Sequence, residues 1–228
     1  MEPCEKSAPF AAATLVLIMV LGPPAPTCRA QEATPFPDPA SVSWDRDPET
    51  LVVSYQDVWA EFADQDPTPL VRIYGDGRVL IHHPAYTPRA GQYESRLASA
   101  ELESLLRSFV ANGLASFEPA LVRRLKISKE RERWQTALAE GKPPELFLVA
   151  DDSTSVFEIH LESYSSPRGA TAPGMAQTSG PVHRTTRWLG LGTDAARYPE
   201  IAEIQRLRAA ELELRALVDR PDLRRVAR

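Results

Sequence analysis

The sequence lacks features that mark several common classes of protein. Its 228 residues include only two cysteines, Cys4 and Cys28, both near the amino terminus. This excludes a thiol nucleophile, a thioredoxin-type redox pair and a thiolate zinc site from the main part of the chain. Apart from one short apolar run near the start, no stretch approaches the roughly 20 residues of a membrane-spanning helix. The net charge of −5 gives no basic excess for nucleic acid, so we expect neither a transporter nor a nucleic-acid-binding protein.

Familiar catalytic motifs are also missing. The chain has no Gly-x-Ser-x-Gly elbow that would position a serine nucleophile. Gly190 and Gly192 lack the lysine of a phosphate-binding loop, and we expect an ordinary turn there. Asp151 and Asp152 are interpreted as turn residues, because the side chain of aspartate forms hydrogen bonds with the nearby backbone in turns. We therefore assign no catalytic residue, metal ligand or cofactor from motifs alone.

The amino terminus has the layout of an export signal. A short apolar run over residues 11–22 follows Lys6 and precedes a proline cluster and a small-residue site ending at Ala30. We expect a signal peptide over residues 1–30, cleaved after Ala30. The alternative is acylation at Cys28, as in bacterial lipoproteins. Either outcome predicts a periplasmic or extracellular protein.

Composition divides the rest of the chain into three parts. Residues 31–50 carry four prolines and predict a flexible tether. Residues 51–220 are expected to form one domain, and residues 221–228 a frayed basic tail. Cleavage after Ala30 would remove both cysteines, so the domain must be held together without disulfides.

The clearest local pattern is a hairpin centred on Asp76-Gly77, after a strand that begins at Leu51. Alternating apolar residues over 70–74 and 78–82 flank this dipeptide, which favours a two-residue type I′ turn. In that register Tyr74 opposes Val79 and Arg72 opposes Ile81. Residues 84–95 are expected to form a loop.

Three helices are predicted. The first is capped at Ser99 and closed by Gly113, and its apolar stripe includes Leu102, Leu106 and Phe109. The second begins at Pro119 and runs through Arg133 or beyond; the residues expected to face the core are Leu121, Leu125, Trp134 and Leu138. The third opens at Tyr198-Pro199 and continues to Pro221.

A second hairpin is expected between residues 146–149 and 156–162, with its turn over 151–154. Alternation places Phe157, Ile159 and Leu161 on one face and Glu158, His160 and Glu162 on the other. Residues 165–183, rich in glycine, serine and proline, predict a long surface loop. These elements indicate an α+β fold, in which an antiparallel sheet of two hairpins plus one strand carries about three helices mainly on one face.

Histidines offer one arrangement that could do chemistry. If the two hairpins paired side by side, His82 or His83 could join His160 and either Glu158 or Glu162. A set of His82, His160 and Glu162 would resemble the ligands of catalytic zinc or iron, and would suit a metal-dependent hydrolase. Nothing in the spacing of these residues supports such a site, and the alternative is that they are exposed residues on the solvent-facing side of ordinary strands.

The most basic stretch of the chain is the run of residues 123–133 in the second predicted helix. It could meet an acidic partner, phospholipid head groups or an anionic envelope polymer. Because Glu130 and Glu132 interleave the positive charges, a solvated, salt-bridged helix face is the alternative. Trp134 and Trp188 are interpreted as core or rim packing.

The hairpin and first helix also resemble known proteins. The run Leu70–Val79 and the run Leu97–Leu102 are similar to a layout in exported bacterial proteins of unknown function, and more loosely to emfourin-type protease inhibitors. The resemblance covers about a quarter of the chain and assigns no residue a role. We therefore expect a non-enzymatic binding or interaction module of the cell envelope or extracellular space. The alternatives are the metal-dependent hydrolase and a secreted protease inhibitor.

Overall fold

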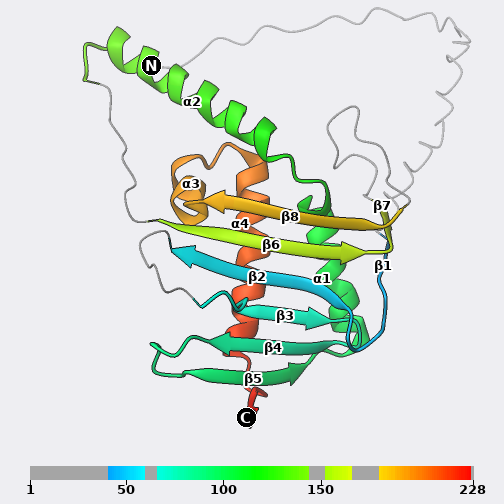
Figure 1. Ribbon diagram of the computed structural model, residues 1–228. Helices are drawn as coiled ribbons and strands as arrows, with labels where there is room; N and C mark the ends of the chain where they lie inside the picture. The colour runs from blue at the N-terminus through cyan, green and yellow to red at the C-terminus, as the bar shows by residue number, and fades with distance from the viewer. Residues whose placement is uncertain (1–40, 60–65, 144–151, 166–179, 227–228) are drawn as a thin grey trace, which may run out of the picture. The chain divides into compact units, whose positions relative to one another are not determined.

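Seven antiparallel strands form the main sheet of the computed structural model, which describes residues 41–59, 66–143, 152–165 and 180–226 (Figure 1). The order across this sheet is β8-β6-β2-β3-β4-β5-β9. The described strands are β1 (Ser41–Ser43), β2 (Leu51–Trp59), β3 (Val71–Tyr74), β4 (Arg78–His83), β5 (Gly91–Arg96), β6 (Ser153–Leu161), β7 (Ser163–Ser165), β8 (Val182–Leu189) and β9 (Arg224–Arg225). The described α-helices are α1 (Ser99–Ala111), α2 (Pro119–Ala139), α3 (Leu191–Arg197) and α4 (Ala202–Ala216), with short 3₁₀ turns at Leu114–Ser116 and Leu217–Asp219.

Helices α1 and α4 lie behind the same face of the sheet, and the core lies between them and the strands (Figure 1). Apolar residues alternate with more polar ones along the strands, and this pattern produces the arrangement because every second side chain points toward the helices. Thus Val71, Ile73, Val79 and Ile81 are buried, and so are the core residues of α1 and α4. The predicted α+β class, with an antiparallel sheet and helices mainly on one face, is confirmed.

The predicted hairpin exists, but its register was wrong by one residue. Ile73 opposes Val79 and Arg72 opposes Leu80, so three residues rather than two connect β3 and β4. Gly77 has a φ of +87°, whereas no described non-glycine residue has a positive φ, and a type I′ turn needs two. Gly77 is instead the last of the three turn residues, and its N–H donates to the Tyr74 carbonyl at 2.9 Å. This register puts Val71 and Ile73 on the same face as Val79 and Ile81.

Among the strands that were not predicted, β5 and β8 were missed because their residues are mostly polar. Residues 91–96, expected to lie in a loop, form β5 and pair with β4. Residues 182–189 form β8, which begins inside the predicted loop of residues 165–183 and pairs with β6. Both strands have exposed polar residues on one face, so their apolar signal is weak. Residues 166–179 of that predicted loop lie outside the described residues.

The structure describes only the second strand of the predicted second hairpin, as β6. Strand β6 pairs with β2 on one edge and with β8 on the other. Residues 144–151 lie outside the described residues, and the predicted turn at 151–154 overlaps the start of β6. The predicted faces of β6 hold: Phe157, Ile159 and Leu161 are buried.

Helix α1 begins and ends close to prediction, with its cap moved by one residue. Ala98 rather than Ser99 is the N-cap, and its N–H donates to the Glu101 carboxylate at 2.7 Å. Gly113 follows the helix in a left-handed conformation, as expected. Helix α4 starts at Ala202, later than predicted, and residues 191–197 form the unexpected short helix α3.

The fold extends beyond residues 51–220 at both ends. Strand β1 pairs with β7, and the Trp44 side chain is buried and donates to the Gly75 carbonyl at 3.0 Å. Residues 41–50, expected to be tether, therefore contact the core. Near the carboxyl terminus, Arg224 and Arg225 pair with β5. The predicted leader over 1–30, the Cys28 alternative and the first part of the tether lie outside the described residues.

Candidate functional site

The structure separates the histidines that were expected to combine. His82 lies on β4 and His160 on β6, with β2 and β3 between them. Three strand spacings amount to about 14 Å, which is too far for ligands of one ion. Glu162 follows the end of β6, and its side chain is exposed. A metal site of His82, His160 and Glu162 was therefore wrong, because the hairpins do not lie side by side.

A different trio does come together, on β6 and β8. Glu158 and His160 point to the face of the sheet opposite α1 and α4, and His183 lies directly across from His160. Glu158 Oε1 lies 3.1 Å from His160 Nε2 and 2.9 Å from His183 Nε2. All three ligand atoms lie within 4.8 Å of one another. Glu158 was among the residues weighed from the sequence, whereas His183 was hidden because β8 was not predicted.

The three side chains are half-exposed, and the hydrogen-bond donors around Glu158 favour the charged form of its carboxylate. The exposed fractions of the side chains are 31% for Glu158, 32% for His160 and 63% for His183. Ser54 Oγ donates to the second Glu158 oxygen at 3.2 Å. Hydrogen bonds from His183 first, then from His160 and Ser54, outweigh partial burial and lower the pKa of Glu158.

His82 is engaged elsewhere, with Asp66. The two side chains meet at 2.5 Å between His82 Nε2 and Asp66 Oδ2. Hydrogen bonds from Thr68, and then from His82, lower the pKa of Asp66 to about 2. His83 points to the opposite face and contacts the edge of the Tyr93 ring, with 5.5 Å between centroids. Neither histidine joins the trio.

Helix α2 is the second notable feature, because the prediction for its buried face was wrong. Leu121, Leu125, Trp134 and Leu138 were expected to face the core, yet they are 43%, 38%, 45% and 58% exposed. Only Val122 is buried among the described residues of this helix. Trp188, in contrast, is 3% exposed and packs in the core.

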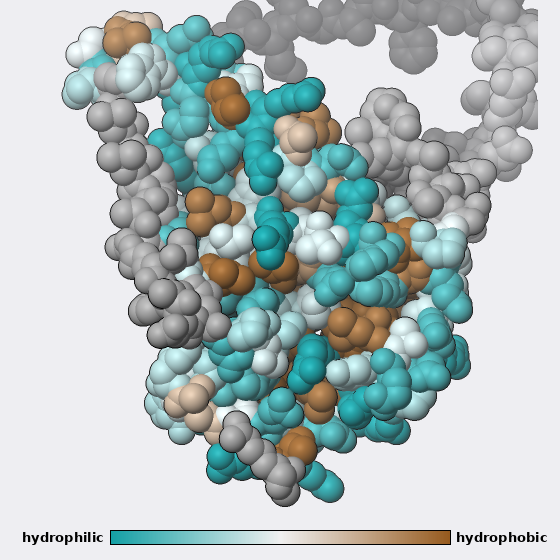
Figure 2. Space-filling view, viewed as in Figure 1, coloured by the Kyte–Doolittle hydropathy of each residue, from teal (hydrophilic) through white to brown (hydrophobic). Residues whose placement is uncertain are grey.

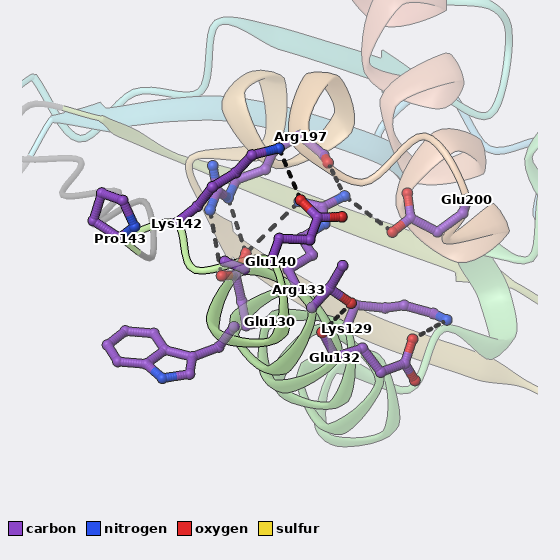
Figure 3. A pocket seen from close by; sticks show the side chains of 12 residues that line it. Lys129, Glu130, Glu132, Arg133, Glu140, Lys142, Pro143, Arg197 and Glu200 are labelled. Carbon is purple, nitrogen blue, oxygen red and sulfur yellow. Dashed lines mark hydrogen bonds and ion pairs between the residues drawn. The ribbon is translucent and has the colours of Figure 1, made fainter.

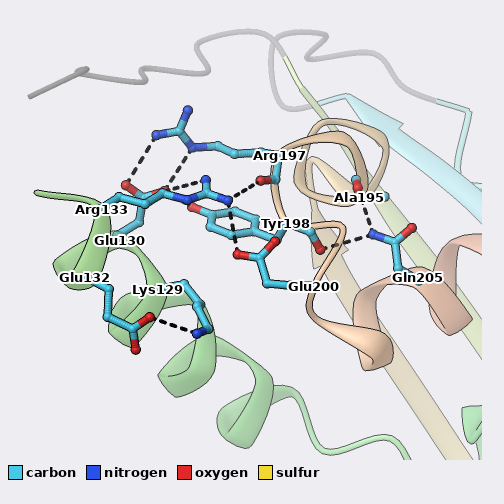
Figure 4. Close-up of polar contacts among 9 residues, drawn as sticks. All are labelled: Lys129, Glu130, Glu132, Arg133, Ala195, Arg197, Tyr198, Glu200 and Gln205. Atoms are coloured by element: carbon cyan, nitrogen blue, oxygen red, sulfur yellow. Dashed lines mark hydrogen bonds and ion pairs between the residues drawn. The ribbon is translucent and has the colours of Figure 1, made fainter. Parts of the chain in front are cut away.

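Polar side chains attach α2 to the rest of the protein. Lys126 Nζ donates to both oxygens of the buried Asp194, at 2.6 and 2.7 Å. Arg197 donates to Glu130 at 2.9 Å, and Arg133 donates to the Arg197 carbonyl at 2.7 Å (Figure 4). Each contact joins α2 to α3 or to the turn that follows it. The helix therefore turns its charged side inward.

A hollow of about 530 Å³ lies beside these contacts, between α2 and α3 (Figure 3). The charged residues that line it form ion pairs with one another: Lys129 with Glu132, Glu130 with Arg197, Arg133 with Glu200, and Lys142 with Glu140. The charge of Arg197 lowers the pKa of Glu130 through their hydrogen bond. This hollow is explained by the attachment of α2.

The outward side of α2 combines apolar and basic residues. Ile127, Arg131, Trp134 and Leu138 follow the spacing i, i+4, i+7, i+11 and so share one side of the helix, which we call the outer face of α2. Arg124 lies one turn earlier on the same side. Ile127 is 60% exposed. Hydrophobic residues interrupt the hydrophilic surface along α2 in Figure 2.

The basic side chains of residues 123–133 differ in the contacts that they make. Lys126, Lys129 and Arg133 form ion pairs, as a salt-bridged helix would. Arg123 lies over the Trp188 ring at 5.8 Å. Within the described part of the chain, Arg124 and Arg131 have no ion pair. Arg124 and Arg131, unlike Arg123, thus lie beside the exposed apolar residues of α2.

Two further findings bear on what the chain is. No helix in the described ranges has the length and apolar character needed to cross a bilayer. Comparisons with protein-family models, with curated proteins and with solved structures find no match for this chain.

Proposed function

We propose that the protein is a non-enzymatic interaction module of the cell envelope or extracellular space, and that it docks on an anionic lipid surface through the outer face of α2. The observation that carries the proposal is the inverted orientation of this helix. Its ionic side is used for attachment to α3, and its apolar side is left in solvent. A surface helix normally has the reverse arrangement.

The chemistry of the outer face matches an anionic bilayer. Trp134, Ile127 and Leu138 can insert into the boundary between head groups and acyl chains, where tryptophan is favoured. Arg124 and Arg131 lie beside them and can contact phosphate, each contributing about 1 kcal/mol near a negative surface. An acidic protein would use the two arginines, but it would leave the row of apolar residues less well matched.

Location is part of the proposal. The apolar run over residues 11–22 and the small-residue site at Ala30 support export, and a protein outside the cytoplasm can reach a phospholipid surface. The expected partners are therefore the head groups of the envelope. A secreted protease inhibitor, suggested by the resemblance of residues 70–79 and 97–102, would instead need a protein partner.

Vesicle binding tests this proposal. We expect sedimentation with vesicles containing phosphatidylglycerol, little sedimentation with pure phosphatidylcholine, and weakening at high salt. Replacing Ile127, Trp134 and Leu138 by serine should abolish binding. Arg124→Gln with Arg131→Gln should weaken it roughly 30-fold, because two arginines contribute about 2 kcal/mol.

Matched controls separate docking from general stickiness. Leu189 and Leu212 are 61% and 50% exposed on β8 and α4, so replacing both by serine removes exposed apolar area away from the outer face of α2. This variant should bind vesicles normally. In a Trp59→Phe background Trp134 is the one exposed tryptophan, since Trp44 and Trp188 are 6% and 3% exposed. The fluorescence emission of Trp134 should shift to shorter wavelength when the protein binds vesicles.

Other outcomes would contradict the lipid assignment. Equal loss in the α2 variant and in the Leu189/Leu212 control would mean that the outer face has no special role. If anionic vesicles fail to bind, or if light scattering shows that the outer face joins two copies of the chain, lipid is the wrong occupant.

A further inference from the structure

We propose that Glu158, His160 and His183 bind one divalent transition-metal ion on the open face of the sheet. This site is independent of α2 and of the docking function. It is built from two neighbouring strands in a fixed register, so the three side chains are positioned by the backbone rather than by a loop.

The distances fit a coordination sphere. Two ligand atoms bound at about 2.1 Å to one ion lie about 3.0 Å apart when the angle between the bonds is about 90°, and about 3.4 Å apart at the tetrahedral angle of about 109°. The two observed separations between an imidazole nitrogen and Glu158 Oε1 are 2.9 and 3.1 Å. The imidazole rings lie 4.0 Å apart between centroids, and the Nε2 atoms of both rings contact the same carboxylate oxygen. Small side-chain rotations would place all three atoms around an ion.

The donor set indicates the class of metal. Two neutral imidazoles and one carboxylate suit zinc and its neighbours in the first transition row, whereas magnesium and calcium prefer oxygen ligands. Glu158 also has the support expected of a ligand, because Ser54 Oγ donates to the oxygen that faces away from the histidines. Three protein ligands leave at least one position for water or for a donor from outside.

Metal binding would replace two hydrogen bonds. In the metal-free arrangement each Nε2 atom lies within hydrogen-bond distance of Glu158 Oε1, so an Nε2–H group can donate to the carboxylate. A metal ion would use the Nε2 lone pair instead, so a neutral imidazole must carry its one proton on Nδ1, and an imidazolium must release its Nε2 proton to solvent. Metal binding therefore competes with protonation of the imidazoles and weakens in acid.

Calorimetric titration of the tag-free protein with Zn²⁺ tests the site, with Mg²⁺ as the control ion. We expect one Zn²⁺ per chain and no Mg²⁺ binding. His160→Ala and His183→Ala should each weaken Zn²⁺ binding by roughly 100-fold or more, and Ser54→Ala by roughly tenfold. Circular dichroism checks that each variant is folded.

The matched control is His83→Ala, which removes an imidazole outside the trio. It should leave Zn²⁺ affinity unchanged. The proposal is overturned if the wild-type protein binds no Zn²⁺ at micromolar concentration, or if the trio variants bind as tightly as the His83 control. Vesicle binding is measured separately on the same trio variants, in which Arg124 and Arg131 are intact. The metal-binding proposal and the lipid-docking proposal can therefore fail independently of each other.

Discussion

At the scale of single residues, the most informative side chain is the buried Glu211. It is 2% exposed and accepts hydrogen bonds from Tyr55 at 2.7 Å and from Ser155 at 3.2 Å, with Arg208 and Arg215 also in contact. Burial alone would raise the pKa of Glu211, but the hydrogen bonds from Tyr55 and Arg208 and the nearby charges outweigh it and lower the pKa. Glu211 therefore joins α4 to β2 and β6 as a carboxylate.

Removing this charge should destabilise the protein. Glu211→Gln leaves Arg208 and Arg215 without their shared carboxylate, so we expect the free energy of unfolding in urea to fall by about 2–4 kcal/mol. Glu203→Gln, which removes a surface partner of Arg206 on the same helix, should cost less than about 1 kcal/mol. Similar losses in both variants would show that the buried network has no special role.

At the scale of elements, the turn between β3 and β4 packs tightly against residues 45–47. A Cβ atom on Gly75 would lie 2.1 Å from the Asp45 carbonyl oxygen and 2.7 Å from that of Asp47. Both are backbone atoms, so no side-chain rotation relieves the clash. The Gly75 N–H also donates to the Thr50 carbonyl at 2.9 Å, which fixes this approach.

Gly75→Ala is expected to lower the free energy of unfolding by about 1–3 kcal/mol, in the range of overpacked cores. Gly180→Ala is the control, because its added Cβ would meet no atom of the described residues within 4 Å. Chemical denaturation of both variants measures the difference. A Gly75 variant as stable as the Gly180 variant would mean that residues 45–47 move away at no cost.

Elements with a strong local pattern could be predicted from the sequence, whereas their pairing could not. The periodic apolar residues of α1 and α4 and the alternation around Gly77 are local signals, and those elements were found. Strands β5 and β8 present polar residues such as Glu94 and Arg187, and they were missed. Since His183 belongs to β8, the metal trio could not be assembled from sequence alone.

The error on α2 has a different physical cause. The prediction assumed that apolar residues face the core, as in most surface helices. The position of α2 is instead set by ionic contacts, above all between Lys126 and the buried Asp194, which also accepts a hydrogen bond from Trp188 at 2.9 Å. Nothing in the local pattern distinguishes a lysine that pairs with Asp194 from one that is solvated.

At the scale of the whole molecule, several carboxylates have lowered pKa values in the folded state. The pKa is about 2 for Asp66 and for Asp222, through hydrogen bonds from Thr68 and Arg220 respectively, and it is also lowered for Glu130, Glu158 and Glu211. Unfolded aspartate and glutamate titrate near 3.9 and 4.3. On acidification the unfolded chain therefore binds protons first, so these groups stabilise the fold above about pH 5 and lose that contribution below it.

We expect the urea midpoint to be level near neutral pH and to fall between about pH 5 and pH 2. Burial, and then the charge of Arg89, lower the pKa of His83, which adds a smaller loss below its usual value of about 6.5. Glu211→Gln should show a flatter dependence, since one of the contributing carboxylates is gone. A midpoint that rises as the pH drops would contradict this assignment of signs.

The strand order also has a consequence for the sequence of folding events. Strands β2 to β5 and helix α1 form one continuous stretch, but β2 is completed on its other edge by β6, so that Ser54 bonds to Glu158 across 104 residues. Closing so long a loop costs entropy before any contact is gained, and sheets with distant pairings fold slowly. Strand β2 thus keeps an open edge during synthesis until β6, at residues 153–161, has been made, and the sheet is completed from the carboxyl-terminal side.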